Sequence, residues 1–302
     1  MGLNLSGMTT ETRNPRTMQL DQMSPLEIVT VMNEEDARVP LAIAKCLPQI
    51  AQAVTWAAES FEKSGRLFYM GAGTSGRLGV LDAAECPPTF GVPKEMVVGL
   101  IAGGEKAFIE AVEGAEDSRE LAVEDLKAHG LTANDLVVGI AASGRTPYVL
   151  GGLDYAKSVG CHTAAIACNV GSAIGKAAEL AIEVNCGPEV LTGSTRLKSG
   201  TAQKLILNMI STGSMVRTGK AYQNLMVDVQ QTNEKLHTRA ENIVIDATGV
   251  EREKARAAID AAGGSVKTAI TMLLADCGAA EAARRLERAH GHVREAIRLE
   301  VL

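Results

Sequence analysis

Five short apolar runs recur through the middle of the chain, and each ends in small polar residues before a stretch with helical periodicity. The runs cover residues 67–70, 96–101, 136–141, 162–167 and 180–184. Apolar runs of this length are typical of buried strands, and the apolar spacing of three and four between them indicates helices. Strands that alternate with helices form right-handed βαβ units. The pattern therefore predicts an α/β fold, with an open parallel sheet covered by helices on both faces.

The N-terminal segment has a different pattern. Residues 1 to about 22 are polar, which predicts an irregular arm or a segment that a partner orders. Apolar positions at helical spacing begin near Pro25 and are interrupted around residues 34–36. We therefore expect two helices before the first strand, with Pro48 as a candidate kink in the second.

The last part of the chain contains an internal repeat. Residues 254–270 and 281–297 align at a period of 27, which places Gly264 over Gly291 and Val266 over Val293. Each copy predicts a helix, a glycine turn and a second helix, as in small ubiquitin-associated-like domains. We expect a packing or dimerisation unit without chemistry of its own. The predicted domains are an arm with helices at 1–55, the α/β domain at 56–238 and a helical domain at 239–302.

Composition and charge narrow the function. The 302 residues include 46% hydrophobic ones and carry a net charge of −6, which gives no general attraction to nucleic acid or to an anionic membrane. The six cysteines show no C-x-x-C spacing and no zinc-type pairing with histidine, so we expect reduced thiols and no metal. The N-terminal stretch lacks the apolar centre of a signal peptide, and no apolar run reaches the roughly 18 residues of a membrane span. We expect a cytoplasmic protein.

The first loop, GAGTSGR at residues 71–77, fits two kinds of ligand. It matches the dinucleotide pattern G-x-G-x-x-G between a strand and a helix. A dinucleotide site also requires an acidic residue about 20 positions later, at the end of the second strand, to hold the ribose. That strand instead runs into Ala102-Gly103-Gly104, and Glu105 already belongs to the next helix. The sequence therefore favours a phosphate over a dinucleotide.

Two further loops are rich in hydroxyl groups. ASGRTP at residues 142–147 follows the third strand, and TGSTRLKSGT at residues 192–201 precedes a long helix expected from about residue 202 to 218. Each loop by itself could simply cap a helix. Three at the carboxyl edge of one sheet would surround a single anion with hydroxyls, backbone N–H groups and helix dipoles. The predicted phosphate ligands are Thr74, Ser75, Ser143, Gly144, Arg145, Thr146, Ser194 and Lys198.

Two carboxylates stand out by their context. Glu85 lies at an apolar helix end that we expect Pro87 and Pro88 to close, where it would be partly desolvated. Glu116 lies in a break between helices after the second strand. Two carboxyl groups in different surroundings can supply one acid and one base. Each glutamate, taken alone, also fits an ordinary surface position.

Several motifs of the sequence resemble those of a known family. GAGTSGR, DAAECPPTFG, VEGAEDSRE, ASGRTPY, TGSTRLKSGTAQK and NLMVDVQQTNEKLHTR are similar to motifs of the N-acetylmuramic acid 6-phosphate etherases, in the sugar isomerase (SIS) superfamily. The resemblance runs from about Thr12 to the C-terminus and implies a SIS-type, flavodoxin-like sheet. It also implies cleavage of a C3 D-lactyl ether, a homodimer and no cofactor. Glu85 matches the family's proton donor, and Glu116 matches its second catalytic glutamate.

The sequence leaves alternatives open for the function and for the roles of the two glutamates. A phosphosugar aldose–ketose isomerase would use the same loops, and a regulator similar to the glucokinase regulatory proteins would bind the sugar phosphate without turnover. The two glutamates could also exchange their roles. A continuous helix places Glu85 about 15 Å beyond Ser75, which is longer than a hexose phosphate. We therefore expect a dimer in which Glu85 serves a site shared between subunits.

Overall fold

The computed structural model describes residues 7–110, 112–231 and 233–299. The chain divides into two compact units, one of Met1–Ala84 with Glu95–Ser211 and one of Glu85–Lys94 with Thr212–Leu302. The arm and the N-terminal helices thus belong to the first unit. The three-part domain division expected from the sequence stays a prediction.

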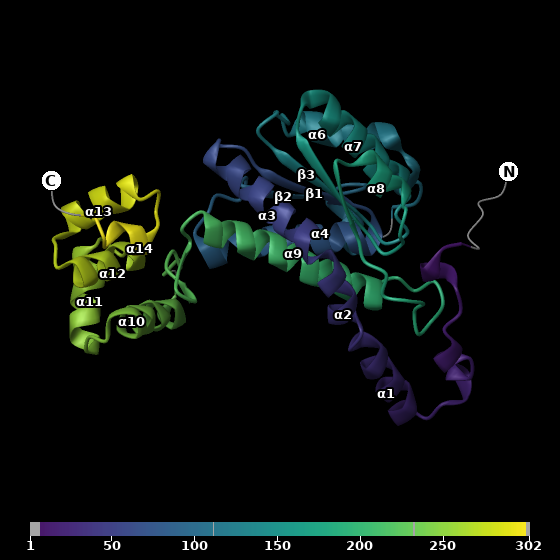
Figure 1. Cartoon of the computed structure of the whole chain (residues 1–302), viewed down its shortest axis with the longest axis horizontal. Helices are drawn as coiled ribbons and strands as arrows, with labels where there is room; N and C mark the ends of the chain where they lie inside the picture. Colours follow the sequence, from purple (N-terminus) through teal and green to yellow (C-terminus); the bar gives the residue numbers. More distant parts are fainter. Residues whose placement is uncertain (1–6, 111, 232, 300–302) are drawn as a thin grey trace. The chain divides into compact units, whose positions relative to one another are not determined.

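A five-stranded parallel sheet is the centre of the first unit (Figure 1). Its strands are β1 (Leu67–Gly71), β2 (Val97–Ile101), β3 (Leu136–Ala141), β4 (His162–Ala167) and β5 (Leu180–Glu183). They follow the order β2-β1-β3-β4-β5, and all neighbours pair in parallel. The predicted open parallel α/β sheet is therefore confirmed. The strand order reverses between β1 and β3, where ligands of such sheets bind beyond the carboxyl ends.

Helices cover both faces of this sheet. In Figure 1 one face carries α6, α7 and α8, and the other carries α3, α4 and α9. The helices of the first unit, including two that continue beyond it, are α1 (Pro25–Asp36), α2 (Val39–Ile43), α3 (Leu47–Glu62), α4 (Gly73–Phe90), α5 (Lys106–Ile109), α6 (Arg119–Ala128), α7 (Pro147–Val159), α8 (Ala173–Ala177) and α9 (Lys198–Arg217). Because both faces are covered, β1 and β3 are buried along their whole length.

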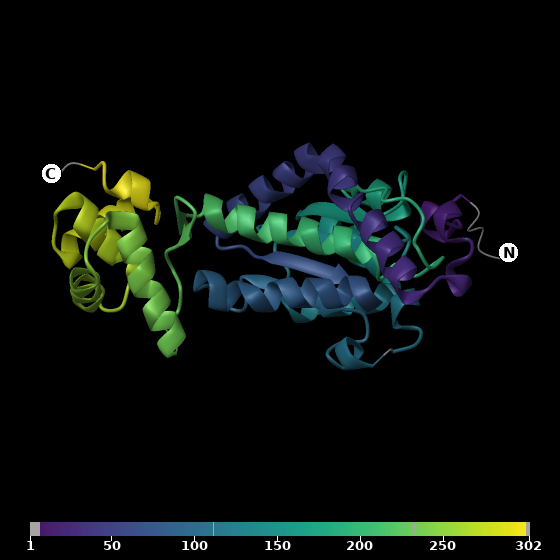
Figure 2. The same ribbon diagram turned by 90° about the horizontal axis from the view of Figure 1, so that it is seen from below.

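Helices α4 and α9 lie side by side on the same face (Figure 2). Tyr69 of β1 faces them, and its hydroxyl donates to the carbonyl oxygen of Leu207 on α9. A Cβ at Gly99 of β2 would lie 2.5 Å from the Cα of Val80, so glycine allows α4 to approach the sheet closely. This close packing fixes the start of α4 above the ends of the strands.

The N-terminal helices differ from the expectation at one point. Ser24 and Glu27 form a reciprocal capping box that starts α1. A short helix, α2, and the 3₁₀ turn Ala44–Cys46 lead into α3. The predicted kink at Pro48 is wrong, because α3 begins at Leu47 and a proline in the first turn lacks only an N–H group that has no helical partner there.

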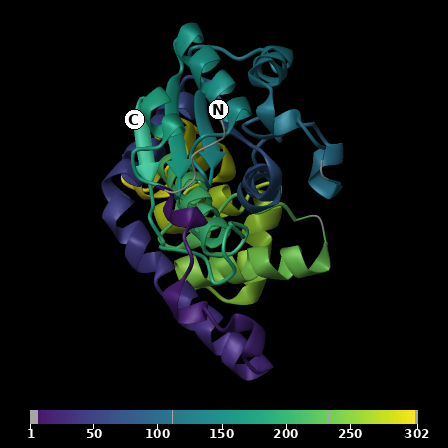
Figure 3. The same ribbon diagram turned by 90° about the vertical axis from the view of Figure 1, so that its right-hand side faces the viewer.

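Residues 1–6 of the predicted arm lie outside the described residues; from residue 7 to α1 the arm is irregular, as expected, but contacts within its own chain order it. It forms the 3₁₀ turns Thr9–Glu11, Pro15–Thr17 and Leu20–Gln22. Thr10, Asn14 and Thr17 are buried, and the hydroxyl of Thr17 donates to the carbonyl oxygen of Val190 at 2.8 Å. Figure 3 shows the arm in purple beside the strand ends. The sequence could not show these contacts because Val190 and Asn169, which bind Thr17 and Thr10, lie more than 150 residues away.

The second unit consists of a small hairpin and a helical bundle. Its elements are β6 (Ala221–Tyr222), β7 (Leu225–Met226), α10 (Glu234–Thr248), α11 (Arg252–Ala261), α12 (Val266–Ala275), α13 (Ala279–Arg288) and α14 (Val293–Ala296). The predicted repeat appears as two helix–turn–helix pairs. Gly264 and Gly291 adopt φ values of +87° and +81° in the two turns, where a residue with a side chain would be strained. Ile259, Val266, Ile270, Leu286 and Val293 pack in one core.

No helix among the described residues has both the length and the apolar character to cross a membrane.

Candidate active site

The first loop turns sharply from β1 into α4. Gly73 has a φ of +52°, and a Cβ at Gly76 would lie 2.7 Å from the carbonyl oxygen of Gly71. These glycines allow the helix to begin two residues after the strand. Thr74 is half-buried and Ser75 is buried in the first turn of α4. The loop thus has the strand-to-helix geometry that the sequence predicts.

The second loop begins beside the first, because Gly71 of β1 is in register with Ile140 of β3. Gly144 has a φ of +76°, and a Cβ there would lie 2.4 Å from the Cβ of Ser172. Thr146 is the N-cap residue of α7, but its side chain makes no capping hydrogen bond. Its hydroxyl is therefore not used as a helix cap. Among the described residues, Arg145 forms no ion pair within 4 Å.

The third loop leads into α9, which begins at Lys198 and not near residue 202. The carboxylate of Glu189 accepts hydrogen bonds from the backbone N–H groups of Lys198 at 3.0 Å and Ser199 at 2.9 Å. It also accepts from the Ser199 hydroxyl at 2.8 Å. A buried carboxylate therefore occupies the helix N-terminus that the sequence offered to a phosphate. Ser194 lies in the loop before it, half-buried.

Lys198 requires a correction. The sequence predicts it as a phosphate ligand, but its side chain is 1% exposed and its Nζ donates to Glu35 Oε2 at 2.6 Å. Arg16 and Asn14 of the arm also donate to that carboxylate. Burial by itself would raise the pKa of Glu35, but the hydrogen bonds from Lys198 and Arg16 outweigh it and lower the pKa to about 2. Lys198 thus belongs to a buried ion pair that joins the start of α9 to α1 and the arm.

Buried polar contacts hold the first and second loops in place at one edge of the sheet. The Ser75 hydroxyl donates to Gln203 Oε1 on α9 at 3.0 Å. Asn169, just after β4, donates from its side-chain nitrogen to the carbonyl oxygens of Ala142 and Ser143, both at 3.3 Å. The same nitrogen reaches the hydroxyl of Thr10 at 3.0 Å. The structure therefore brings the first loop to the start of α9, and the second loop to the arm.

Three residues of this network escaped the sequence reasoning, namely Asn169, Glu189 and Gln203. A partial signal existed for Asn169, which follows an apolar run in the same way as the predicted loops. Glu189 and Gln203 have no local pattern that marks them. Their partners are fixed by strand order and helix packing.

Glu116 lies at a cavity beside the first loop. It occupies the 3₁₀ turn Ala115–Asp117 between α5 and α6, which confirms the predicted break between helices. The cavity has a volume of about 230 Å³, and its lining includes Ala72, Gly73, Arg77 and Glu116. Ligand pockets typically have volumes of ~300–1,000 Å³, so this cavity suits part of a sugar phosphate. Arg77 is held by hydrogen bonds to the carbonyl oxygens of Phe108 and Ala107.

Glu85 also requires a correction. The sequence predicts a partly desolvated carboxylate at a helix end closed by prolines. In the structure α4 continues through Pro87 and Pro88 to Phe90, and Glu85 is exposed. Each proline lacks the N–H that would bond back to the preceding turn, so α4 continues past Glu85 without two of its backbone hydrogen bonds. None of the residues that the structure describes buries Glu85, which stays exposed.

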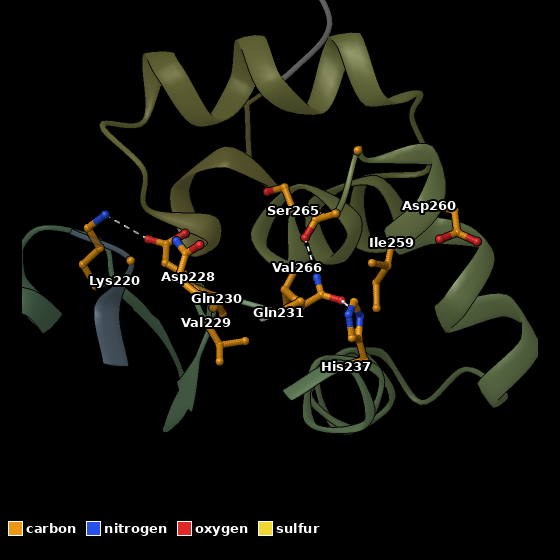
Figure 4. A pocket seen from close by; sticks show the side chains of 14 residues that line it. Lys220, Asp228, Val229, Gln230, Gln231, His237, Ile259, Asp260, Ser265 and Val266 are labelled. Atoms are coloured by element: carbon orange, nitrogen blue, oxygen red, sulfur yellow. Dashed lines mark hydrogen bonds and ion pairs between the residues drawn. The ribbon is translucent and has the colours of Figure 1, made fainter. Parts of the chain in front are cut away.

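The second unit has its own polar cavity of about 490 Å³ (Figure 4). Its lining includes Asp228, Gln231, His237, Asp260 and Ser265. Gln231 donates to the carbonyl oxygen of Gly264 at 2.6 Å, and its Oε1 lies 3.1 Å from the Nδ1 of His237. These contacts hold the segment before α10 against the α11–α12 turn.

The cysteines are free, and five of the six are buried. Burial raises the pKa of Cys161 to about 11 and that of Cys186 to about 12, so these thiols are protonated near neutral pH. No cluster of His, Cys, Asp and Glu among the described residues could hold a metal ion.

Comparison with known proteins first defines the class. A family model described as "SIS domain" matches residues 120–212, and one described as "Glucokinase regulatory protein N-terminal SIS domain" matches residues 49–157. A phosphoheptose isomerase from Francisella tularensis has the same fold, with a TM-score of 0.50 at 18% identity over 64% of this chain and all of that one. The sheet and its three loops thus form a SIS-type domain.

Full-length relatives then define the family. The chain is 63% identical to an N-acetylmuramic acid 6-phosphate etherase of an Exiguobacterium species, over 97% of this chain and 100% of the relative. It is 61% identical to the protein of the same name from Pectobacterium atrosepticum, over 98% and 97% of the two chains. The chain belongs to the N-acetylmuramic acid 6-phosphate etherase family.

Proposed function

We propose that this protein cleaves the ether between C3 of N-acetylmuramic acid 6-phosphate and its D-lactyl group, which gives N-acetylglucosamine 6-phosphate and D-lactate. The observation that carries the proposal is the 63% identity over almost the whole chain to a protein of that name. The site described above supports it independently, since hydroxyl-rich loops at the topological switch point suit a phosphate monoester.

Elimination followed by hydration avoids the poor reactivity of an alkyl ether. When the sugar ring opens to its aldehyde, the C2 proton becomes acidic and a carboxylate removes it. The C2 electron pair forms a double bond to C3, the C3–O bond breaks, and a carboxylic acid protonates the departing lactate oxygen. Water then adds its hydroxyl to C3 and a proton to C2. Both stages are acid–base chemistry that carboxyl groups can perform without a cofactor.

We assign the C2 proton to Glu116 and protonation of the lactate oxygen to Glu85, with the reverse assignment as the alternative. The position of Glu116 at the cavity beside Gly73 supports its role, because a base must come within reach of the sugar that the first loop holds. The role of Glu85 rests on the family resemblance.

We assign the phosphate to the loop residues Thr74, Ser75, Ser143, Gly144, Arg145, Thr146 and Ser194. The hydroxyl of Thr146 is not used for capping, and Arg145 has no ion-pair partner among the described residues, which supports both as donors to an anion. Lys198 is removed from this set because its ammonium group is buried against Glu35.

A homodimer with shared sites accounts for the exposure of Glu85. General acid catalysis at neutral pH favours a carboxyl group with a raised pKa, which desolvation provides. A second subunit that covers Glu85 would supply that desolvation. The free thiols further support a reducing compartment, and we place the protein in the cytoplasm.

The test follows two products of the same reaction in heavy water. Wild-type protein should release lactate and incorporate deuterium at C2, whereas Glu85→Gln and Glu116→Gln should each lose about 10²–10⁴-fold in rate. Glu124→Gln, an exposed glutamate of α6, is the matched control and should retain full activity. Deuterium uptake without lactate release would indicate an isomerase, and full activity in both site variants would reject the catalytic assignment.

A further inference from the structure

Gln203 combines deep burial with an incomplete set of hydrogen bonds. Its side chain lies on α9, and the residue is 1% exposed. Its Oε1 accepts from the hydroxyl of Ser75 at 3.0 Å. Its Nε2 has no hydrogen-bond partner among the residues that the structure describes. A side-chain amide carries two N–H donors, so both are unsatisfied in this arrangement.

An orphaned buried amide nitrogen is uncommon in folded proteins. Buried polar groups nearly always find partners, and those left without one frequently have a functional reason. An apolar side chain of the same length would avoid the cost, so packing alone does not explain a glutamine here. The position of the amide supplies an explanation, because it contacts a hydroxyl of the first loop.

The direction of the Ser75 hydrogen bond matters for phosphate binding. While the Ser75 hydroxyl donates to Gln203, it presents only acceptor lone pairs to other groups. A phosphoryl oxygen is also an acceptor, so Ser75 cannot donate to it in this state. If the amide turns over, its nitrogen donates to Ser75 Oγ, and the hydroxyl hydrogen becomes available to the phosphoryl group. The two amide orientations have nearly the same shape, so the pocket accommodates both.

We propose that Gln203 is a positioning residue for the phosphate, and that its amide turns to donate to Ser75 when the sugar phosphate binds. The turn also reduces the unsatisfied amide donors from two to one. Orphaned carbonyl oxygens are better tolerated than orphaned N–H groups, which favours the turned state once Ser75 has an acceptor. This inference rests on the proposed function, because it requires a phosphorylated ligand at the first loop.

The test replaces Gln203 with methionine in the full-length protein. Gln203→Met removes the amide but keeps the length of the side chain. We expect the dissociation constant of N-acetylglucosamine 6-phosphate, measured by calorimetry, to rise about two- to tenfold, as for the loss of one neutral hydrogen bond, because Ser75 keeps its hydroxyl but loses the donor that orients it. The KM of the etherase should rise similarly while kcat stays within about twofold, because a phosphate grip contributes binding that is uniform along the reaction. The melting temperature should stay level or rise.

Gln49→Met is the matched control, since Gln49 Oε1 is also buried without a partner but lies on α3, which carries none of the three loops. It should leave affinity and KM unchanged. In a Ser75→Ala background, Gln203→Met should add almost nothing, because the amide acts through that hydroxyl. Gln203→Asn, whose amide is too short to reach Ser75, should weaken binding as methionine does.

Several results would overturn the proposal. Unchanged affinity in Gln203→Met would do so, as would full additivity with Ser75→Ala, or loss of folding in both Gln203 variants, which would assign the amide a structural role. If wild-type protein fails to bind N-acetylglucosamine 6-phosphate, the proposed function fails first. If wild-type protein binds it and Gln203→Met binds it equally well, only the role of Gln203 fails.

Discussion

The start of α9 and the segments that carry the two glutamates are both polar, but they bury their polar groups very differently. Lys198, Ser199 and Gln203 are each 1% exposed. Glu85 and Glu116 are exposed. The side chains of Lys198 and Ser199 are held by buried partners, whereas the two glutamates are open to solvent. Variants in the two regions should therefore fail in different ways, by loss of stability at the start of α9 and by loss of activity at the glutamates.

The largest effect should come from the glutamates and should leave stability almost unchanged. Glu85→Gln and Glu116→Gln should each remove nearly all activity, while the free energy of unfolding changes by less than about 0.5 kcal/mol, as for most surface substitutions. Mixing the two inactive proteins under conditions of subunit exchange should restore about a quarter of wild-type activity. Half of the dimers are then mixed, and each mixed dimer has one intact shared site.

Lactate release from the mixture measures this complementation. Glu85→Gln mixed with the double variant Glu85→Gln/Glu116→Gln is the control and should stay inactive. A failure of the first mixture to recover activity, with exchange verified, would place both glutamates of a site in one subunit.

The opposite behaviour is expected at the start of α9. Lys198→Met leaves the buried Glu35 carboxylate without its closest cation and should destabilise the protein by about 3 kcal/mol. Combining it with Glu35→Leu should recover most of that loss, because an apolar pair needs no desolvation of charge. Trp56 is the chain's one tryptophan and lies on α3, so its fluorescence in urea reports the first unit.

The same variant checks the sequence-based role of Lys198. If Lys198→Met keeps its full stability but binds phosphate more weakly, Lys198 is a phosphate ligand. That result would contradict the buried ion pair that the structure gives it.

A smaller effect on the free energy of unfolding should appear at low pH. The pKa of Glu35 is lowered to about 2 from an ordinary value of 4.5, so its ionised form stabilises the folded state. That stabilisation is fully present above about pH 4.5 and is lost as the pH falls towards 2, by about 3 kcal/mol at most. The free energy of unfolding, measured in urea, should fall between pH 6 and 2.5 in wild-type protein. It should fall less steeply in Glu35→Gln. Equal slopes would show that the ion pair does not control acid stability.

The smallest effect concerns the helix cap next to Glu116. The Ser118 side chain accepts a hydrogen bond from the backbone N–H of Leu121 at 3.1 Å and so starts α6. Ser118→Ala should cost about 1 kcal/mol. It should also lower kcat, because the cap fixes the turn that carries Glu116. Ser24→Ala, which removes the cap of α1, should cost similar stability with no change in kcat. If Ser118→Ala and Ser24→Ala have the same kcat, the cap of α6 does not position Glu116.

The sequence by itself determined the elements and the chemistry of the loops. Apolar runs and glycine turns gave the five strands, the loops at Gly71 and Ala142, the break at Glu116 and the C-terminal repeat. Such features depend on neighbours within a few residues, so a local pattern records them. The family could be inferred because long motifs in those same loops are characteristic of it.

Only the tertiary structure decided which polar residues are buried. The carboxylate of Glu35 meets Lys198 across 163 positions, and Ser75 meets Gln203 across 128. Strand order and helix packing create these contacts, and no local spacing encodes them. For the same reason the sequence mistook Lys198 for a ligand and expected Glu85 to be desolvated. Burial depends on which distant segments cover a residue, and that is a property of the folded chain.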